Sequence, residues 1–198
     1  MKRDIRGVLS DLQRFGAEND THETERVKKM LNLEPETAQL LSILLRSSGA
    51  KRVLEIGTSN GYSTIWLANA VAETGGQVIS VERSADKQAM ARENLERAGL
   101  LSHVSLVLGD ATEVARELAG PFDFVFFDAD RWSAPEQLRI LMPKLAAKVV
   151  ITADNVLSHP QEIEGYLKAV SELAGFDHFV VPVGKGLSIV FRGAKSAS

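Results

Sequence analysis

The sequence has no cysteine among its 198 residues. Disulfide bonds, thiolate metal sites and cysteine nucleophiles are therefore excluded from its chemistry. Long apolar runs are also missing, since none approaches the roughly 18 residues of a membrane-spanning helix. Charged residues recur from Lys2 to Arg6, so this segment lacks the apolar stretch of a signal peptide. We expect a cytoplasmic protein with no membrane partner.

An excess of basic residues is absent as well: 23 Lys and Arg stand against 26 Asp and Glu, a net charge of −3. This balance argues against a phosphate backbone as the main partner, because proteins that bind one are usually basic. The hydrophobic share of 44% is close to the globular average and can form a substantial core. We expect a single domain over 1–198, with a helical extension over 1–48, a core over 49–193 and a tail over 194–198.

The extension is predicted to be helical. Apolar residues recur at helical spacing from Ile5 onward, so we expect a first helix that ends at Gly16. A second helix is expected over 23–31. A third begins at Glu36, directly after a proline, as helix starts often do.

Beyond residue 50 the pattern changes to short apolar runs alternating with helical stretches. Near-continuous apolar strands separated by helices indicate a parallel sheet that is buried on both faces. The expected strands are 52–56, 77–81, 104–108, 122–127 and 148–152, and the expected helices are 62–72, 85–98, 112–119 and 134–142.

The last part of the chain is predicted to be a helix followed by a hairpin. The runs 179–181 and 187–191 are joined by so short a turn that they must be antiparallel. Capping boxes are expected to start two helices, with Ser133 and Ser158 as the capping residues.

A glycine-containing turn follows the first predicted strand. Gly57 and Gly61 let the backbone pass close to a ligand, and the next helix points its N-terminal amides at that ligand. Position 59 is serine, so the dinucleotide fingerprint is absent and a nicotinamide dehydrogenase is disfavoured. For a glycine pair alone, an ordinary strand-to-helix turn explains the pattern equally well.

Acidic residues follow the next two strands. Glu82 directly follows the second strand, where a carboxylate can accept both hydroxyls of a ribose. Taken with the glycine turn, nucleoside binding is a better interpretation than a solvated charge. Asp110 follows the third strand, where it either contacts an adenine amino group or caps the next helix.

Two aspartates and an asparagine follow the fourth and fifth strands. Asp128 and Asp154 are separated by one right-handed crossover, which puts both at the same edge of neighbouring strands. With Asn155 they would offer three hard oxygen donors that suit Mg²⁺, Ca²⁺ or Mn²⁺ rather than zinc. On spacing alone, two helix-capping aspartates explain the pattern better.

Taken together, these motifs resemble the class I S-adenosylmethionine (SAM)-dependent methyltransferases. Within that class the chain looks like the cation-dependent O-methyltransferases, which include the catechol and caffeoyl-CoA O-methyltransferases. The resemblance covers most of the chain and rests on the segments 32–36, 53–63, 81–82, 108–111, 127–130, 154–157 and 182–187.

The resemblance implies a fold and a set of roles. The fold would be a Rossmann-like α/β structure, with a seven-stranded mixed sheet whose last strand is antiparallel and helices on both faces. SAM would be held by Glu55, Gly57, Ser59, Gly61, Ser63, Glu82, Asp110, Ala111 and Asp128. A divalent cation, most simply Mg²⁺, would be held by Asp128, Asp154 and Asn155.

One departure from the family concerns the catalytic pair implied by the resemblance, Asp128 and Arg131. The group usually has lysine where this chain has Arg131, and that lysine is taken as the general base. Arginine stays protonated in proteins, so it cannot accept the proton. It would instead bind an anionic substrate group or pair with a carboxylate.

The expected function is therefore transfer of a methyl group from SAM to a hydroxyl of a small aromatic or vicinal-diol acceptor, assisted by a divalent cation. Two alternatives remain: an O-methyltransferase acting on a tRNA base, and a SAM-binding protein without catalytic activity. The helical N-terminal extension and the resemblance to dimeric relatives also predict a homodimer.

Overall fold

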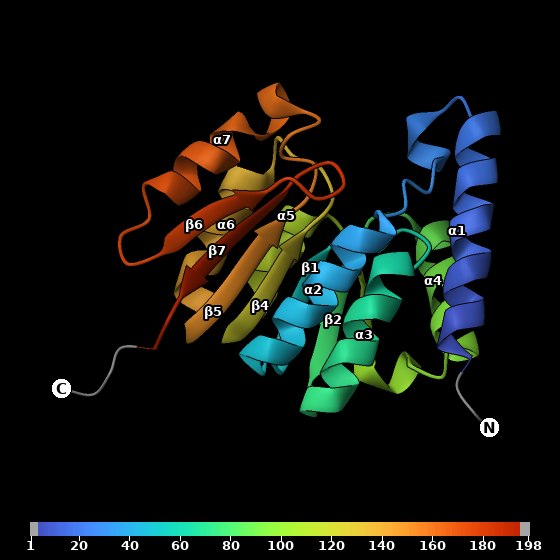
Figure 1. Ribbon diagram of the computed structural model, residues 1–198, viewed down its shortest axis with the longest axis horizontal. Coiled ribbons are helices and arrows are strands. Elements are labelled where there is room, and N and C mark those ends of the chain that lie inside the picture. Colours follow the sequence, from blue (N-terminus) through green and yellow to red (C-terminus); the bar gives the residue numbers. More distant parts are fainter. Residues whose placement is uncertain (1–3, 195–198) are drawn as a thin grey trace.

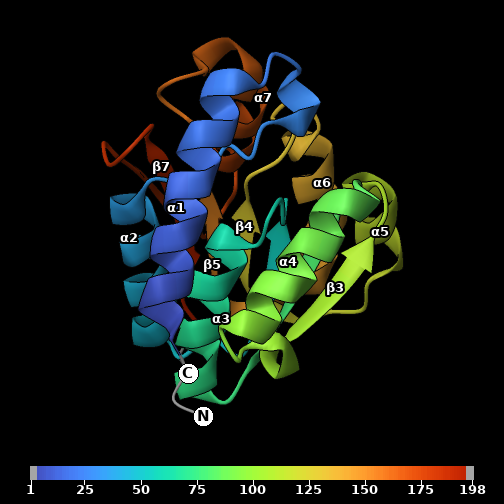
Figure 2. The same ribbon diagram turned by 90° about the vertical axis from the view of Figure 1, so that its right-hand side faces the viewer.

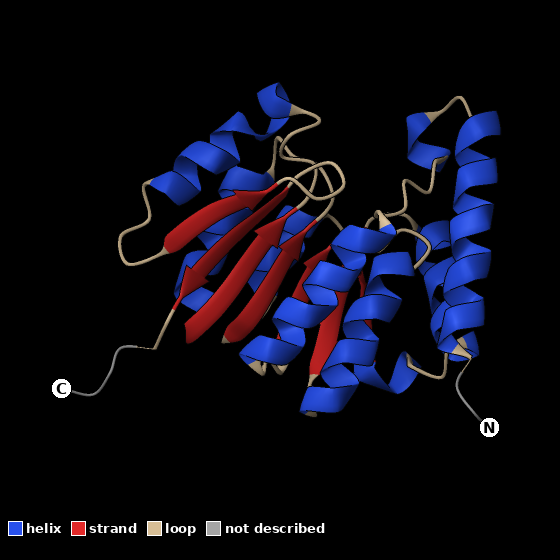
Figure 3. Cartoon of the chain, viewed as in Figure 1, coloured by secondary structure: helices blue, strands red, loops and turns tan. Residues whose placement is uncertain are grey.

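The structure is a computed structural model that describes residues 4–194. Helices and strands alternate through most of it (Figure 3). The predicted tail over 194–198 lies outside the described residues, apart from Ala194. The helices are α1 (Ile5–His22), α2 (Pro35–Ser48), α3 (Tyr62–Thr74), α4 (Ala85–Arg97), α5 (Ala111–Glu117), α6 (Ala134–Leu141) and α7 (Pro160–Ser171). The strands are β1 (Arg52–Ile56), β2 (Gln77–Glu82), β3 (Val104–Leu108), β4 (Phe122–Phe127), β5 (Leu145–Ala153), β6 (Asp177–Val181) and β7 (Leu187–Arg192).

The seven strands form one sheet in the order β3-β2-β1-β4-β5-β7-β6. Strands β1 to β5 pair in parallel, and β7 runs antiparallel to both of its neighbours. The predicted mixed sheet and its terminal hairpin are therefore confirmed. The strand order reverses at β1: β2 and β3 lie on one side of it, and β4 and β5 lie on the other. At such a switch point the loops diverge and leave room for a ligand at the carboxyl edge of the strands.

Helices cover the sheet on both faces (Figures 1 and 2). On one face Leu45 of α2 and Ile65 of α3 pack with Phe124 of β4 in a buried apolar cluster. On the other face Leu138 of α6 packs in a second cluster with Val125, the next residue of β4. Successive side chains of a strand point to opposite faces, which explains why β4 is apolar at almost every position. Within residues 4–194 no helix is both long enough and apolar enough to cross a membrane.

The N-terminal segment differs from its prediction in two places. The first helix continues through Gly16 to His22, because Gly16 is buried against the side chain of Asn32. The expected helix over 23–31 is also wrong: only the short 3₁₀ turn Arg26–Lys28 forms there. The helix was predicted from local spacing alone. Hydrogen bonds from another part of the chain hold these residues in an irregular conformation instead.

Asp20 provides those bonds. Its carboxylate accepts the backbone N–H groups of Met30 at 2.6 Å and Leu31 at 2.8 Å. The main-chain amides that would continue a helix are therefore used by an acid from α1. Within the segment that follows, Met30 and Leu33 are buried before α2 begins.

The two predicted capping boxes are also wrong. Ser133 precedes α6, but its hydroxyl donates to Asp130 instead of accepting a backbone amide. The Ser158 hydroxyl contacts the Asn155 carbonyl and the His159 ring, and His159 is the residue at the cap of α7. In both places a loop contact in the folded chain replaces the local capping bond.

One part of the sheet has no helix over it. Figure 1 shows α6 and α7 behind β6 and β7, whereas the front of these two strands is open. Phe179 of β6 pairs in register with Ile189 of β7, so both side chains lie on the same face. Phe179 is 69% exposed there, and Phe191 is 36% exposed. The sheet therefore has an uncovered apolar face at this end.

A buried carboxylate lies on β1, inside the sheet. Glu55 of β1 is fully buried and accepts hydroxyl hydrogen bonds of 2.6 Å from Ser63, Thr64 and Ser80. Burial raises the pKa of Glu55 from its usual 4.5 to about 7, and the hydroxyls only partly oppose this shift. The network joins β1, β2 and the first turn of α3.

We expect this carboxylate to make the fold less stable as the pH rises from about 4.5 to about 7. In that range the folded state keeps the proton while the unfolded state has lost it, so the free energy of unfolding falls with pH. The shift corresponds to about 3 kcal/mol. Denaturant unfolding at several pH values should show a smaller slope for Glu55→Gln than for the wild type. Equal slopes would mean that the pKa of Glu55 is the same in the folded and the unfolded state.

Candidate cofactor and cation sites

The turn between β1 and α3 has a shape that only glycine allows at two positions. Gly57 has φ of 105° and Gly61 has φ of 88°, in the region that side-chain-bearing residues rarely adopt. A Cβ at Gly57 would also overlap the backbone carbonyl of Asp128. The turn thus lies against the end of β4, and α3 begins just beyond it. The first N–H group of α3, from Tyr62, is bonded to the Asn60 side chain, and the following ones point the same way.

Glu55 and Ser63 lie beneath this turn. Because the Glu55 carboxylate is occupied by three hydroxyls, it holds the start of α3 in place from below. Ser63 is 7% exposed and donates its hydroxyl to Glu55. A direct contact of either residue with a cofactor stays a prediction.

Glu82 ends β2 beside the same turn. Its Oε2 accepts the backbone N–H of Ser59 at 2.8 Å, and its Oε1 accepts that of Ser84 at 2.9 Å. Each carboxylate oxygen has a second lone pair, which remains for a ligand hydroxyl. The Ser59 hydroxyl donates to the carbonyl of Met30, so Ser59 also ties the turn to the N-terminal segment.

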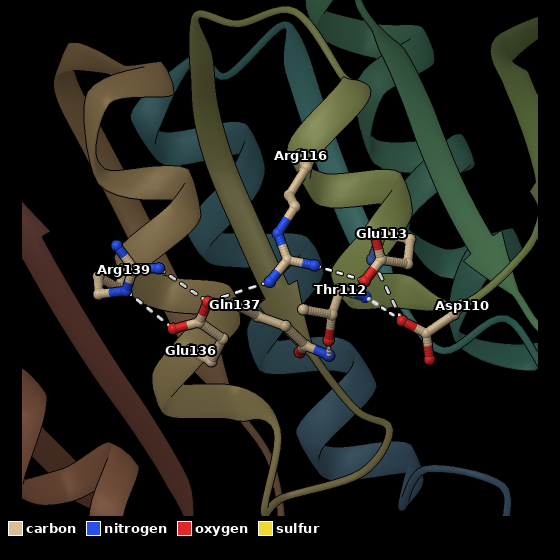
Figure 4. A network of polar contacts seen from close by, with 7 residues as sticks. All are labelled: Asp110, Thr112, Glu113, Arg116, Glu136, Gln137 and Arg139. Carbon is tan, nitrogen blue, oxygen red and sulfur yellow. Dashed lines mark hydrogen bonds and ion pairs between the residues drawn. The ribbon is translucent and has the colours of Figure 1, made fainter.

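Asp110 follows β3 and caps α5, which begins with Ala111. One oxygen, Oδ1, accepts the N–H groups of both Thr112 and Glu113, at 2.9 and 3.1 Å. Figure 4 shows this cap next to the ion pairs that join Arg116 to Glu113 and to α6. Capping, one of the two predicted roles, is therefore present, and the second oxygen of Asp110 is free for a ligand.

The structure brings the three predicted cation ligands together at the ends of β4 and β5. The Asn155 amide donates to Asp154 at 2.5 Å and lies 3.5 Å from Asp128 Oδ1. Asn155 has φ of 65°, and Asp154 Oδ1 is buried without a hydrogen-bond partner. A buried carboxylate oxygen without a donor is costly, so the site lacks one positive or donating group.

The electrostatics of the two aspartates support the same conclusion. Burial, and then repulsion from Asp154, raises the pKa of Asp128 well above its usual value. Burial is also the main reason why the pKa of Asp154 rises to about 6. Each of the two carboxyls therefore favours its protonated form unless a positive charge lies close by. Among residues 4–194 no group of three His, Cys, Asp or Glu side chains is placed to hold a metal ion; this cluster has two carboxylates and the Asn155 amide.

Arg131 lies next to this cluster but is engaged elsewhere. Its guanidinium pairs with Glu162 of α7, with N–O distances of 2.6 and 2.8 Å, and its side chain is only 10% exposed. Of the two roles suggested by the sequence, pairing with a carboxylate is therefore the observed one. The pair fastens the loop after β4 to α7.

Sequence patterns did not identify Glu162, Glu34 or Lys185 as part of this region. Glu34 precedes α2 and pairs with Lys185 of the β6–β7 turn at 2.7 Å. Lys185 lies inside one of the segments that carry the family resemblance, but its partner is 151 positions away in the chain and no local pattern connects them.

Comparisons with known proteins identify the family. The profile described as O-methyltransferase matches residues 6–173. A catechol O-methyltransferase of Mycobacterium tuberculosis is 37% identical over 71% of this chain and 62% of its own length. One of Niastella koreensis is 36% identical over 64% of this chain and 59% of its own length. The matched part thus spans about three fifths of these curated relatives.

Solved structures agree with the sequence comparisons. An O-methyltransferase from Bacillus cereus in complex with SAH has a TM-score of 0.79 at 25% identity, covering 94% of this chain and 91% of that one. The O-methyltransferase TomG from Streptomyces achromogenes, in complex with SAM, has a TM-score of 0.79 at 25% identity, covering 94% and 90%. With its carboxyl-edge acids, its mixed sheet and these matches, the chain belongs to the O-methyltransferase family.

Proposed function

We propose that this chain transfers a methyl group from SAM to a hydroxyl of a small aromatic or vicinal-diol acceptor, with the help of a divalent cation. The observation that carries the proposal is the convergence of Asp128, Asp154 and Asn155 directly beside the glycine turn. The contact of Gly57 with the Asp128 carbonyl makes the proposed cofactor and cation sites neighbours, as methyl transfer between their two ligands requires.

The residues at the tips of β1, β2 and β3 fit the parts of SAM. The amides at the start of α3 suit a carboxylate, because helix N-termini attract negative charge. Glu82 keeps lone pairs for the two ribose hydroxyls, and Asp110 and Ala111 lie at the next strand end along, where an adenine would follow. Family relatives in complex with SAM and SAH support this assignment.

The aspartate cluster fits a hard divalent cation such as Mg²⁺. Its two carboxylates supply hard oxygen ligands, and one buried oxygen of Asp154 has no partner. Asn155 would add its side-chain oxygen once its amide is turned, since its nitrogen now faces both aspartates. A cation bound there supplies positive charge that lowers the pKa of an acceptor hydroxyl and orients it.

Arg131 holds a loop in place and does not remove the proton from the acceptor. It remains cationic, and its pairing with Glu162 keeps the loop that carries Asp128 and Asp130 against α7. Asp130 lies at the exposed end of that loop and accepts a hydrogen bond from Ser133. The acceptor proton therefore passes to Asp130 or to solvent.

We expect chelation to abolish methyl transfer, and Mg²⁺ or Mn²⁺ to restore it. The assay uses labelled SAM with catechols, hydroxycinnamoyl esters and unmodified tRNA as acceptors. Asp154→Ala should lose the cation response but keep SAM affinity, because the two groups occupy different strand ends. Asp177→Ala, at the far edge of the sheet, is the control.

Full activity in excess EDTA would reject the cation site. Activity on tRNA alone would support the RNA alternative, and SAM binding without turnover would support a non-catalytic protein.

Glu82→Ala should weaken SAM binding by about 1–3 kcal/mol, because charged hydrogen bonds to the ribose are lost. Calorimetry measures the affinity directly and needs no acceptor. Asp86→Ala is a matched control, since this acid is exposed on the first turn of α4. Unchanged affinity in the Glu82 variant would remove the ribose assignment.

We also propose that the uncovered apolar face of β6 and β7 binds a second copy of the chain. Phe179 is 69% exposed, and its register partner Ile189 lies on the same face of the sheet. Light scattering at micromolar concentration should give a dimer for the wild type and a monomer for Phe179→Asp. Phe15→Asp, an exposed phenylalanine on α1, should remain dimeric. A monomeric wild type would contradict the proposal.

A further inference from the structure

The segment 29–32 contacts the glycine turn and is held there by hydrogen bonds from side chains. Within the described part of the chain, no main-chain to main-chain hydrogen bond engages residues 30–32. Their amides are held instead by Asp20, whose carboxylate accepts the N–H groups of Met30 and Leu31. Segments without helix or sheet hydrogen bonds open at a low cost in free energy. This segment can therefore leave the turn while the helices and the sheet stay intact.

Two other side chains hold successive carbonyl groups of the segment. The Ser59 hydroxyl donates to the Met30 carbonyl at 2.8 Å, and the Ser59 N–H donates to Glu82 Oε2, also at 2.8 Å. Ser59 therefore contacts both the segment and the proposed ribose carboxylate. The Lys87 ammonium donates to the Lys29 carbonyl at 2.6 Å, across 58 positions of the chain. The segment is thus a wall of the proposed ribose site, and Lys87 is one of the residues that hold it.

The backbone is strained on both sides of the contact between the segment and the turn. Leu31 has φ of 50° and Ser59 has φ of 48°, values that residues with side chains rarely adopt. The Leu31 side chain is 47% exposed, so its burial does not hold it in this conformation. Strained residues persist where surrounding contacts hold them, and they are common at ligand sites.

Lys87 is electrostatically unfavourable at its position in the chain. It is half-buried in the first turn of α4, where the helix dipole disfavours a positive charge. Burial lowers the pKa of its ammonium from the usual 10.5. No Asp or Glu within residues 4–194 forms an ion pair with it. Its hydrogen bond goes to the segment, which points to a role in holding the segment closed.

We propose that Lys87 is a positioning residue of the SAM site, which keeps the segment 29–32 against the glycine turn and slows the release of bound cofactor. This inference rests on the SAM site of the proposed function and is independent of the cation site. Lys87 acts through the Lys29 carbonyl and needs no contact with the cofactor. Without this hydrogen bond the segment is held less firmly, and the wall beside Glu82 opens more often.

The test measures the release of SAH, the product of methyl transfer, by stopped-flow displacement on the full chain without acceptor or metal. Lys87→Met keeps the length of the side chain but removes the donor. It should raise the dissociation rate constant of SAH on the order of tenfold, as expected for the loss of one charged hydrogen bond. Lys87→Arg keeps a charged donor and should restore a rate close to that of the wild type.

Hydrogen exchange tests the same hydrogen bond without any ligand. In Lys87→Met the amides of Met30 and Leu31 should exchange faster than in the wild type, because the segment opens more often. The amides of the β4 strand, in the middle of the sheet, should exchange at unchanged rates. Faster exchange throughout the chain would show a general loss of stability and would overturn the inference.

Lys148 provides a matched control. Its ammonium donates to the carbonyl of Ser48, at the end of α2, with a distance of 2.8 Å. Lys148→Met therefore also removes a lysine–carbonyl hydrogen bond between distant segments, but it should leave SAH release unchanged. An unchanged release rate in Lys87→Met, or an equal rise in Lys148→Met, would overturn the inference and leave the SAM site in place. A wild type that does not bind SAH would overturn the inference and the SAM site together.

Discussion

Negative charge crowded at the carboxyl edge of the sheet is the constraint on which the rest of this structure depends. Glu55, Glu82, Asp128 and Asp154 end or nearly end four adjacent strands, and Glu34 approaches them from the N-terminal segment. Carboxylates this close and this buried repel one another, so each requires its own compensation. The surrounding loops are arranged to provide it.

The means of compensation differ and define distinct roles. Glu55 is surrounded by hydroxyls, and burial raises its pKa to about 7, which suits a residue that supports the glycine turn from within. Glu82 accepts hydrogen bonds from two backbone amides and keeps its other lone pairs beside the glycine turn. Asp128 and Asp154 have no such donors beyond Asn155, and this difference is what makes them a candidate cation site.

Cationic side chains in this region fasten loops instead of filling the aspartate cluster. Arg131 holds the loop after β4 to α7, and Lys185 holds the β6–β7 turn to Glu34. Both contacts join segments that are distant in the chain. Where the family usually has a lysine that can exchange a proton, this chain has Arg131, which stays protonated and holds the loop after β4 to α7.

The sequence by itself determined the sheet, its parallel and antiparallel parts, and the strand ends where Gly57, Glu82 and Asp128 lie. Local apolar periodicity and glycine conformation suffice for these features, because both depend on neighbours in the chain. Only the tertiary structure decided that Asp20 prevents a helix over 23–31 and that Glu34 meets Lys185. Such contacts form only when packing of the sheet and helices brings distant side chains together. The order of neighbouring residues in the chain does not predict them.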